Sequence, residues 1–172
     1  HDNMLESFQS DTSNDSTISF WTQKQATNLS LEELVYLSGF LQGEGLREYI
    51  DSFRRKKYLC NAAIFWMFND CWPCTRSWTV VDYYLRRTPS FYPVRRGFAP
   101  VSVALCQNGG QVDIIGINDT LEEFEGTLLF GAFRWDGTYV VKTEQTVIVR
   151  AESAHVIATL PDSTVEIDGC DA

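Results

Sequence analysis

Cys71 and Cys74 are the pair whose spacing most directly suggests chemistry, because they form a C-x-x-C motif with Pro73 before the second cysteine. Thiol–disulfide oxidoreductases place this motif at the start of a helix that follows a strand. Here the residues after Cys74 are rich in β-formers, and no βαβ unit precedes the pair, so redox chemistry is the less favoured interpretation. A second pair of Cys or His ligands is missing from the sequence, so no metal site is predicted.

Three carboxylates, Asp70, Asp82 and Glu44, are candidates for acid/base work. Retaining hydrolysis of a glycosidic bond needs two carboxyl groups about 5–5.5 Å apart. For Asp82 and Glu44 the ordinary alternative is a structural role, as a helix cap or a member of an ion pair. The sequence has no Gly-rich phosphate loop and no G-x-S-x-G elbow, and it predicts no cofactor.

The apolar run at residues 62–68 is the element that must position these side chains. The run carries no charge and no polar alternation, which predicts a strand buried on both faces, in a parallel sheet covered by helices. Asn69, Asp70 and Trp72 follow in a turn at the carboxyl end of this strand. Ligands bind at that end in open α/β sheets and in α/β barrels. These three residues are therefore candidates for ligand contact.

Helices are predicted before and after this run. Ser30 and Glu33 form a capping box at the start of a helix whose apolar residues recur at three- and four-residue steps as far as Phe53. A second helix is predicted to begin near Ser90. One strand with two apolar faces cannot close a sheet with these helices alone. We therefore expect residues 1–100 to be the end of a larger α/β domain.

From residue 101 the pattern changes to short β-like runs separated by turn residues. Such runs at spacings of about 8–12 residues are typical of an antiparallel sandwich. The sequence therefore predicts two domains, residues 1–100 and residues 101–172. The six predicted strands are 101–105, 111–117, 127–133, 138–142, 146–149 and 155–160.

The composition excludes some classes of partner. A net charge of −9 argues against nucleic acid. No stretch approaches the about 18 consecutive apolar residues of a membrane-spanning helix. Five cysteines without a framework spacing indicate free thiols. Five Trp, seven Tyr and eleven Phe are many for 172 residues, and aromatic side chains form cores but also line sugar sites. No signal peptide is visible, and the localisation stays open.

The stretch at 65–73, FWMFNDCWP, followed by SWTVVDYY at 77–84, resembles glycoside hydrolase family 2, especially its β-mannosidase-like branch. In that branch a Trp-Gln-x-Asn-Asp-Cys-Trp-Pro stretch ends the last barrel strand, and a Ser-Trp-Ser-x-x-Asp-Tyr-Tyr stretch follows. The match extends over residues 30–101. The resemblance implies the last part of a (β/α)8 barrel in residues 1–100, followed by an immunoglobulin-like antiparallel β-sandwich in residues 101–172.

The resemblance also implies a retaining β-glycosidase that hydrolyses β-linked sugars from glycans or oligosaccharides. Both catalytic glutamates of the family belong to earlier barrel strands, and neither motif occurs in this sequence, so no catalytic residue is assigned. The chain alone is expected to be inactive, with the N-terminal part of the same protein and a carbohydrate substrate as its partners. Trp72 is expected to face the sugar beside Asn69 and Asp70, whereas Trp66 and Trp78 are expected in the core.

Two other function classes remain open. The sandwich and the aromatic turn could hold carbohydrate without cleaving it, as a non-catalytic binding module. A thiol–disulfide oxidoreductase that uses Cys71 and Cys74 is the less favoured alternative.

Overall fold

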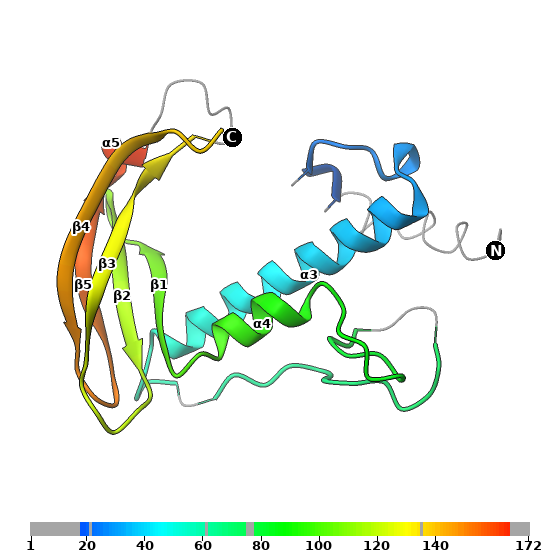
Figure 1. Ribbon diagram of the computed structural model, residues 1–172, viewed down its shortest axis with the longest axis horizontal. Helices are drawn as coiled ribbons and strands as arrows, with labels where there is room; N and C mark the ends of the chain where they lie inside the picture. The colour runs from blue at the N-terminus through cyan, green and yellow to red at the C-terminus, as the bar shows by residue number, and fades with distance from the viewer. Residues whose placement is uncertain (1–17, 21, 61, 75–77, 135, 166–172) are drawn as a thin grey trace. The chain divides into compact units, whose positions relative to one another are not determined.

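The computed structural model describes residues 18–165 apart from positions 21, 61, 75–77 and 135 (Figure 1). The chain forms two compact units. The first combines His1–Ile50 with Ala63–Phe98, and the second combines Asp51–Ala62 with Ala99–Ala172. Each unit is described by itself below. Within the described residues, no helix is long and apolar enough to cross a membrane.

Helix α3 (Leu31–Arg54) follows a short 3-10 turn, η1 (Ala26–Asn28), and begins at the predicted capping box. The backbone N–H of Ser30 donates to Glu33 Oε2 at 3.0 Å, and the backbone N–H of Glu33 donates to Ser30 Oγ at 3.3 Å. The bond from the Ser30 amide and a second one from the Ser30 hydroxyl to Glu33 Oε2, at 2.9 Å, hold the pKa of the Glu33 carboxyl below its usual value. The capping-box prediction is therefore confirmed.

In the first unit, α3 packs against helix α4 (Phe91–Gly97), and Figure 1 shows the two side by side. The helices can approach closely at Gly43 because glycine has no side chain. A Cβ at this position would lie only 2.8 Å from Ser90 Cα. The core beneath them is formed by Ile50, Val80, Val81 and Val94, with Leu46, Ala63, Phe65 and Phe91 packed around it.

The apolar run at 62–68 is not a strand, so this prediction is wrong. Ala63 and Phe65 pack on the core, but Ile64 is 81% exposed and Trp66 is 74% exposed. Among the described residues, this segment and its turn take part in one isolated β-bridge, between Asn69 and Val81. A strand buried on both faces needs a hydrogen-bonded neighbour on each side. Without such neighbours, the run is an irregular segment with one buried side.

The second unit contains an antiparallel sandwich-like arrangement of two sheets, as the sequence predicts. One sheet has the order β1-β2-β5, and the other pairs β3 with β4. Among the described residues there are five strands rather than six, because the predicted strands 138–142 and 146–149 are one strand. The residues between them contain no turn former and continue the ladder with β3. The elements are β1 (Val101–Gln107), β2 (Gln111–Asn118), β3 (Phe124–Phe133), β4 (Tyr139–Val149), β5 (Ser153–Pro161) and the short helix α5 (Asp162–Val165).

Small and polar residues let β4 pack against β2 and β5. A Cβ on Gly116 would lie 3.0 Å from Val149 Cγ2, and Gln145 Nε2 donates to the carbonyl of Ile157 at 3.1 Å. Asn118 is fully buried, and its side chain donates to the carbonyls of Glu122 at 2.8 Å and Val149 at 3.1 Å. These bonds fix the end of β2 to the residues around β3 and β4.

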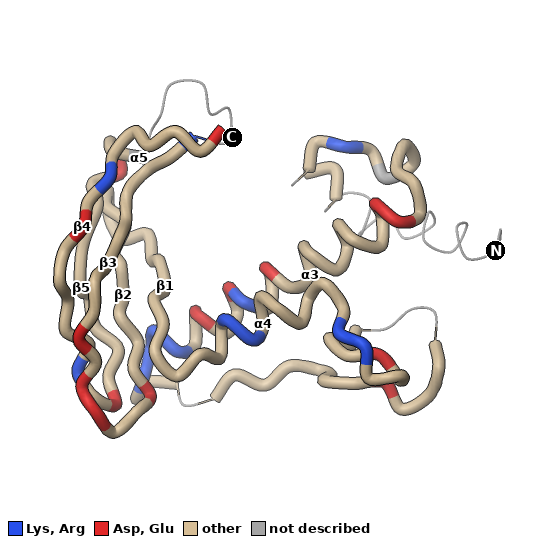
Figure 2. Tube along the Cα trace, in the orientation of Figure 1, with Lys and Arg blue, Asp and Glu red and all other residues tan. Residues whose placement is uncertain are grey.

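Basic residues at the end of α3 belong to the second unit, and Figure 2 shows them as a blue segment. Arg54 Nη2 lies 2.6 Å from Asp119 Oδ2, and Lys57 Nζ lies 2.7 Å from Asp119 Oδ1. Tyr58 adds a hydrogen bond of 2.6 Å from its hydroxyl to the carbonyl of Glu152. Residues 51–62 are thereby attached to the strands of this unit.

Candidate functional site

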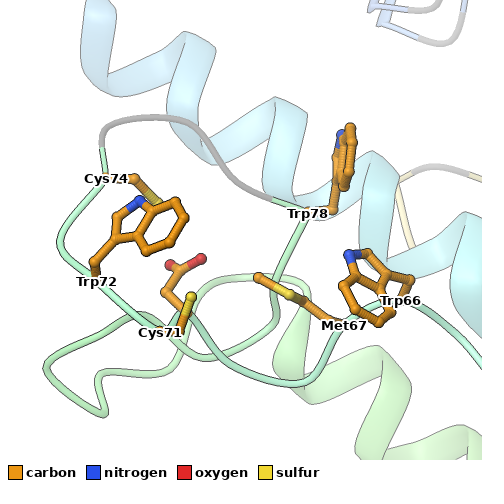
Figure 3. Close-up of a pocket in the computed structure, with 7 residues that line it drawn as sticks. Trp66, Met67, Cys71, Trp72, Cys74 and Trp78 are labelled. Atoms are coloured by element: carbon orange, nitrogen blue, oxygen red, sulfur yellow. The ribbon is translucent and has the colours of Figure 1, made fainter.

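The turn after the apolar run contributes to a pocket in the first unit (Figure 3). The volume of the pocket is about 590 Å³, which lies within the range of about 300–1,000 Å³ that is usual for small-molecule sites. Seven residues line it: Trp66, Met67, Asp70, Cys71, Trp72, Cys74 and Trp78.

Backbone hydrogen bonds attach this turn to the core of the unit. The amides of Val80 and Val81 both donate to the carbonyl of Phe68, at 3.2 and 3.0 Å, and the amide of Asp70 donates to the carbonyl of Val81 at 3.3 Å. Val80 and Val81 are buried in the core. Because the turn is tied to buried residues, its side chains are held at the pocket although the segment has no regular secondary structure.

Asp70 is the lining residue with a carboxylate, and it is only 7% exposed. The hydroxyl of the buried Thr79 donates to Asp70 Oδ2 at 3.1 Å. Asn69 is exposed and is not among the residues that line the pocket; its side-chain amide donates to the carbonyl of Asp70 at 3.0 Å. The structure thus places Asp70 and Trp72 at one pocket, and Asn69 precedes Asp70 in the chain without lining the pocket.

Three indole rings line the pocket, and the sequence assigned only Trp72 to it. Trp66 is 74% exposed and Trp78 is 68% exposed, so the prediction that they belong to the core is wrong. Figure 3 shows Trp72 on one side of the pocket, with Trp66 and Trp78 on the opposite side. The signal that could have identified Trp66 is its position next to Phe65, because neighbouring side chains of an extended segment point to opposite sides.

The other candidate carboxylates have structural partners away from the pocket. Asp82 accepts hydrogen bonds from the backbone amide of Arg86 at 2.8 Å and from its Nε at 2.6 Å. Desolvation raises the pKa of Asp82, but these bonds and the charge of Arg86 outweigh it, so the pKa lies below its usual value. Glu44 pairs with Arg96 at 3.4 Å and with Arg47 at 3.8 Å. Neither residue lines the pocket.

Cys71 and Cys74 are exposed free thiols that line the same pocket. The described residues that follow them are irregular as far as α4, so Cys71 does not begin a helix there. The part of the chain that the structure describes contains no group of three or more Cys, His, Asp or Glu placed to hold a metal ion.

A known family model matches part of the second unit. Residues 110–171 match the family model of the Mannosidase Ig/CBM-like domain. β-Mannosidase B of Thermothelomyces thermophilus is 40% identical over 80 residues, which are 44% of this chain and 9% of that protein. β-Mannosidase B of Aspergillus oryzae is 40% identical over 82 residues, 46% of this chain and 10% of that protein. The similarity to the β-mannosidase-like branch of glycoside hydrolase family 2 is confirmed.

The chain is also similar to solved structures. The crystal structure of β-D-mannosidase from Dictyoglomus thermophilum has a TM-score of 0.69 and 31% identity, over 80% of this chain and 17% of that chain. The exo-chitosanase CsxA of Amycolatopsis orientalis has a TM-score of 0.61 over 83% of this chain and 17% of that chain, and at 22% identity it shows the fold alone. The chain therefore spans about a tenth of the length of these curated relatives and about a sixth of the length of the solved structures.

Proposed function

We propose that this chain is part of a retaining β-glycosidase of the β-mannosidase type, which hydrolyses β-linked sugars from glycans or oligosaccharides. In this proposal residues 1–100 contribute the last part of a (β/α)8 barrel, and residues 101–172 form the immunoglobulin-like sandwich after it. The observation that supports it best is the pocket, because Trp72 and Asp70 line it and lie in the stretch that resembles the family motif.

The chemistry of this pocket suits a sugar. An indole offers a flat apolar surface for the carbon–hydrogen face of a pyranose ring, and Trp72 is 66% exposed. A carboxylate accepts hydrogen bonds with both oxygens, and the hydroxyl of Thr79 donates to one of them, Asp70 Oδ2. We propose that Trp72 forms a wall of the sugar site and that Asp70 accepts a sugar hydroxyl, with Asn69 beside it.

This chain alone is proposed to be inactive. Retaining hydrolysis needs two carboxyl groups about 5–5.5 Å apart. The described residues that line the pocket include one carboxylate, Asp70. The two glutamates would come from an N-terminal part of the same protein, which is the partner in this proposal. Purified chain is expected to release no product from an aryl β-mannoside above background, and sustained release would contradict this.

Binding tests the assignment of the pocket. Trp72→Ala is expected to weaken binding of β-linked mannose oligosaccharides about five- to thirtyfold, measured by calorimetric titration, because the loss of one stacked aromatic ring removes about 1–2 kcal/mol. The matched control is Tyr139→Ala, which removes a half-exposed ring from β4 in the other unit. Unchanged binding by Trp72→Ala would contradict the proposed sugar site.

A non-catalytic carbohydrate-binding module is the second candidate. The matched family model is described as Ig/CBM-like, and Phe133 and Tyr139 form an exposed aromatic pair, with ring centroids 6.2 Å apart, at the end of the β3–β4 pair. The same titration separates the two candidates. Binding that is lost in Tyr139→Ala but kept in Trp72→Ala would favour the module.

A further inference from the structure

Two of the residues that line the pocket are cysteines, and the proposed function gives neither of them a role. Cys71 and Cys74 are both exposed, and neither belongs to a disulfide. Figure 3 shows both of them on the Trp72 side of the pocket. Because Trp72 lies between them in the chain, a group attached to either sulfur would stand close in sequence to the ring that is proposed to stack on the sugar.

Two cysteines outside the pocket lining provide an internal comparison. Cys60 and Cys106 are only partly exposed, and their thiols donate hydrogen bonds to the carbonyls of Ala62 at 3.8 Å and of Gln107 at 3.7 Å. The rate at which a cysteine exchanges with a disulfide depends on access to its sulfur as well as on its thiolate fraction. Exposure therefore favours reaction at the two cysteines of the pocket.

The reaction that suits an exposed thiol beside a cavity is exchange with a small disulfide. The thiolate attacks one sulfur of the small disulfide and forms a mixed disulfide with it, and the other half leaves as a thiolate that takes up the proton lost by the cysteine. The protein sulfur is oxidised and the departing sulfur is reduced, so the small disulfide is itself the oxidant. Disulfides of the glutathione class are reagents of this type, and the product is reversible by thiols.

We propose that Cys71 and Cys74 form a thiolation site for small disulfides, and that a mixed disulfide at either position occupies the pocket and excludes the sugar. The inference rests on the proposed function and adds regulation to the same site. The pocket has a volume of about 590 Å³, and a group tethered to its lining has an effective concentration there of about millimolar or more. Sugar binding is therefore blocked while the bond lasts and returns after reduction.

The rate of modification at each cysteine tests the site itself. The 172-residue chain is incubated with oxidised glutathione, and peptide mass mapping follows the product at each position. Cys71 and Cys74 are expected to form the mixed disulfide about tenfold or more faster than Cys60 and Cys106. Reaction at Cys60 or Cys106 that is as fast would overturn the proposal, and so would an internal Cys71–Cys74 disulfide as the only product.

Sugar titration tests the consequence of thiolation. Binding of methyl β-mannopyranoside to the thiolated chain is expected to be about tenfold or more weaker than to the reduced chain, and dithiothreitol should restore it. In the reduced chain, saturating sugar should also slow the reaction of Cys71 and Cys74 and leave the rate at Cys60 unchanged. Full sugar binding after thiolation, or modification of the pocket cysteines that the sugar does not slow, would overturn the proposal.

Two double variants form a matched pair for this titration. Cys60→Ser with Cys106→Ser keeps both pocket thiols, so oxidised glutathione should weaken its sugar binding as much as in the unmodified chain. In Cys71→Ser with Cys74→Ser, the same treatment should change the affinity by about twofold or less. Cys170 lies outside the described residues and is kept in both variants, so any effect of its modification is common to the two. Equal sensitivity of the two variants would overturn the proposal.

The outcomes separate this inference from the function on which it rests. A reduced chain that binds no sugar would reject the proposed function, whereas the order of the modification rates would still decide whether the thiolation site exists. Sugar binding that depends on Trp72 but survives thiolation of Cys71 and Cys74 would leave the proposed function standing and overturn this inference.

Discussion

The aromatic turn at residues 62–82 and the strands at 101–161 both contain many apolar side chains, but the two regions differ in how their backbones are paired and how their side chains are buried. In the strands, hydrogen-bonded ladders run the whole length of β1 with β2, and the ends of the strands are joined by buried polar groups such as Asn118. In the turn, three indoles are largely exposed, and the backbone is held by a few hydrogen bonds to Val80 and Val81.

The difference lies in where each segment finds its partners. A hairpin strand pairs with a neighbour a few residues away in the chain, so its apolar side chains find a surface to cover them. The run at 62–68 takes part in no ladder among the described residues, although its composition is as apolar as that of a buried strand. Burial follows from available partners and not from hydrophobicity alone.

The largest expected contrast is between two asparagines, one in each region. Asn118 is fully buried, and its Oδ1 accepts hydrogen bonds from the amide and the hydroxyl of Thr120 at 2.9 and 2.7 Å. Asn118→Ala is expected to lower the free energy of unfolding by about 3 kcal/mol, because the carbonyl of the buried Val149 and the polar groups of Thr120 and Glu122 lose their partner. The exposed Asn69 is the matched control, and Asn69→Ala should change the free energy of unfolding by about 0.5 kcal/mol or less. Urea denaturation followed by circular dichroism measures both.

Equal losses in the two asparagine variants would break the comparison, since they would show that the turn is as tightly held as the strands. A loss in Asn118→Ala of less than about 1 kcal/mol would show that water replaces its hydrogen bonds.

Features with local causes were predictable from the sequence. The capping box of Ser30 and Glu33 lies within one helical turn. The turn between β1 and β2 was predictable because two consecutive glycines separate the apolar runs, and glycine accepts positive φ without strain. In the structure Gly109 and Gly110 both have positive φ, at 57° and 94°. The continuity of the strand within residues 138–149 was not predictable from local sequence, because the ladder with β3 decides whether two short runs join into one strand.

The site was predictable in part. The proline-containing turn after an apolar run, together with the family resemblance, pointed to Trp72 and Asp70, and both line the pocket. Trp66 and Trp78 were assigned to the core because large aromatic residues usually are buried. Their exposure depends on which side of the segment faces the core, and that side is set by tertiary contacts such as the packing of Phe65 on the cluster that contains Val80.

The second contrast is between two glycines of α3, and it tests whether the first unit has a tightly packed part of its own. A Cβ on Gly43 would lie 2.8 Å from Ser90 Cα and 2.9 Å from Pro93 Cγ, whereas a Cβ on Gly45 would have no neighbour within 4 Å. Gly43→Ala is therefore expected to lower the free energy of unfolding by about 2 kcal/mol. Gly45→Ala should raise it by about 0.5–1 kcal/mol through better helix propensity. Thermal denaturation decides this, and destabilisation of similar size in both variants would contradict the close packing of α3 on α4.

The smallest contrast is electrostatic and concerns Asp119, which holds residues 51–62 to the strands. Desolvation raises the pKa of Asp119, but hydrogen bonds and charges from Lys57 and Arg54 outweigh it and lower the pKa below the unfolded value of about 3.9. The unfolded chain therefore binds the proton more readily, so the stabilisation is complete above about pH 4 and is lost as the pH falls through the folded pKa. Because the side chain is 46% exposed, Asp119→Asn should lower the free energy of unfolding at pH 7 by only about 0.5–1 kcal/mol.

The measurement for Asp119 is urea denaturation of both proteins from pH 7 to pH 2, and the difference between them should shrink toward zero at the acid end. Glu123→Gln, an exposed carboxylate on the same stretch between β2 and β3, is the control and should differ little from the unmodified chain at any pH. A difference for Asp119→Asn that stays constant down to pH 2 would show that the side chain acts through its shape and hydrogen bonds and not through its charge. In that case the attachment of residues 51–62 would rest on hydrogen bonds such as that from Tyr58 to Glu152, and the charge of Asp119 would contribute nothing to it.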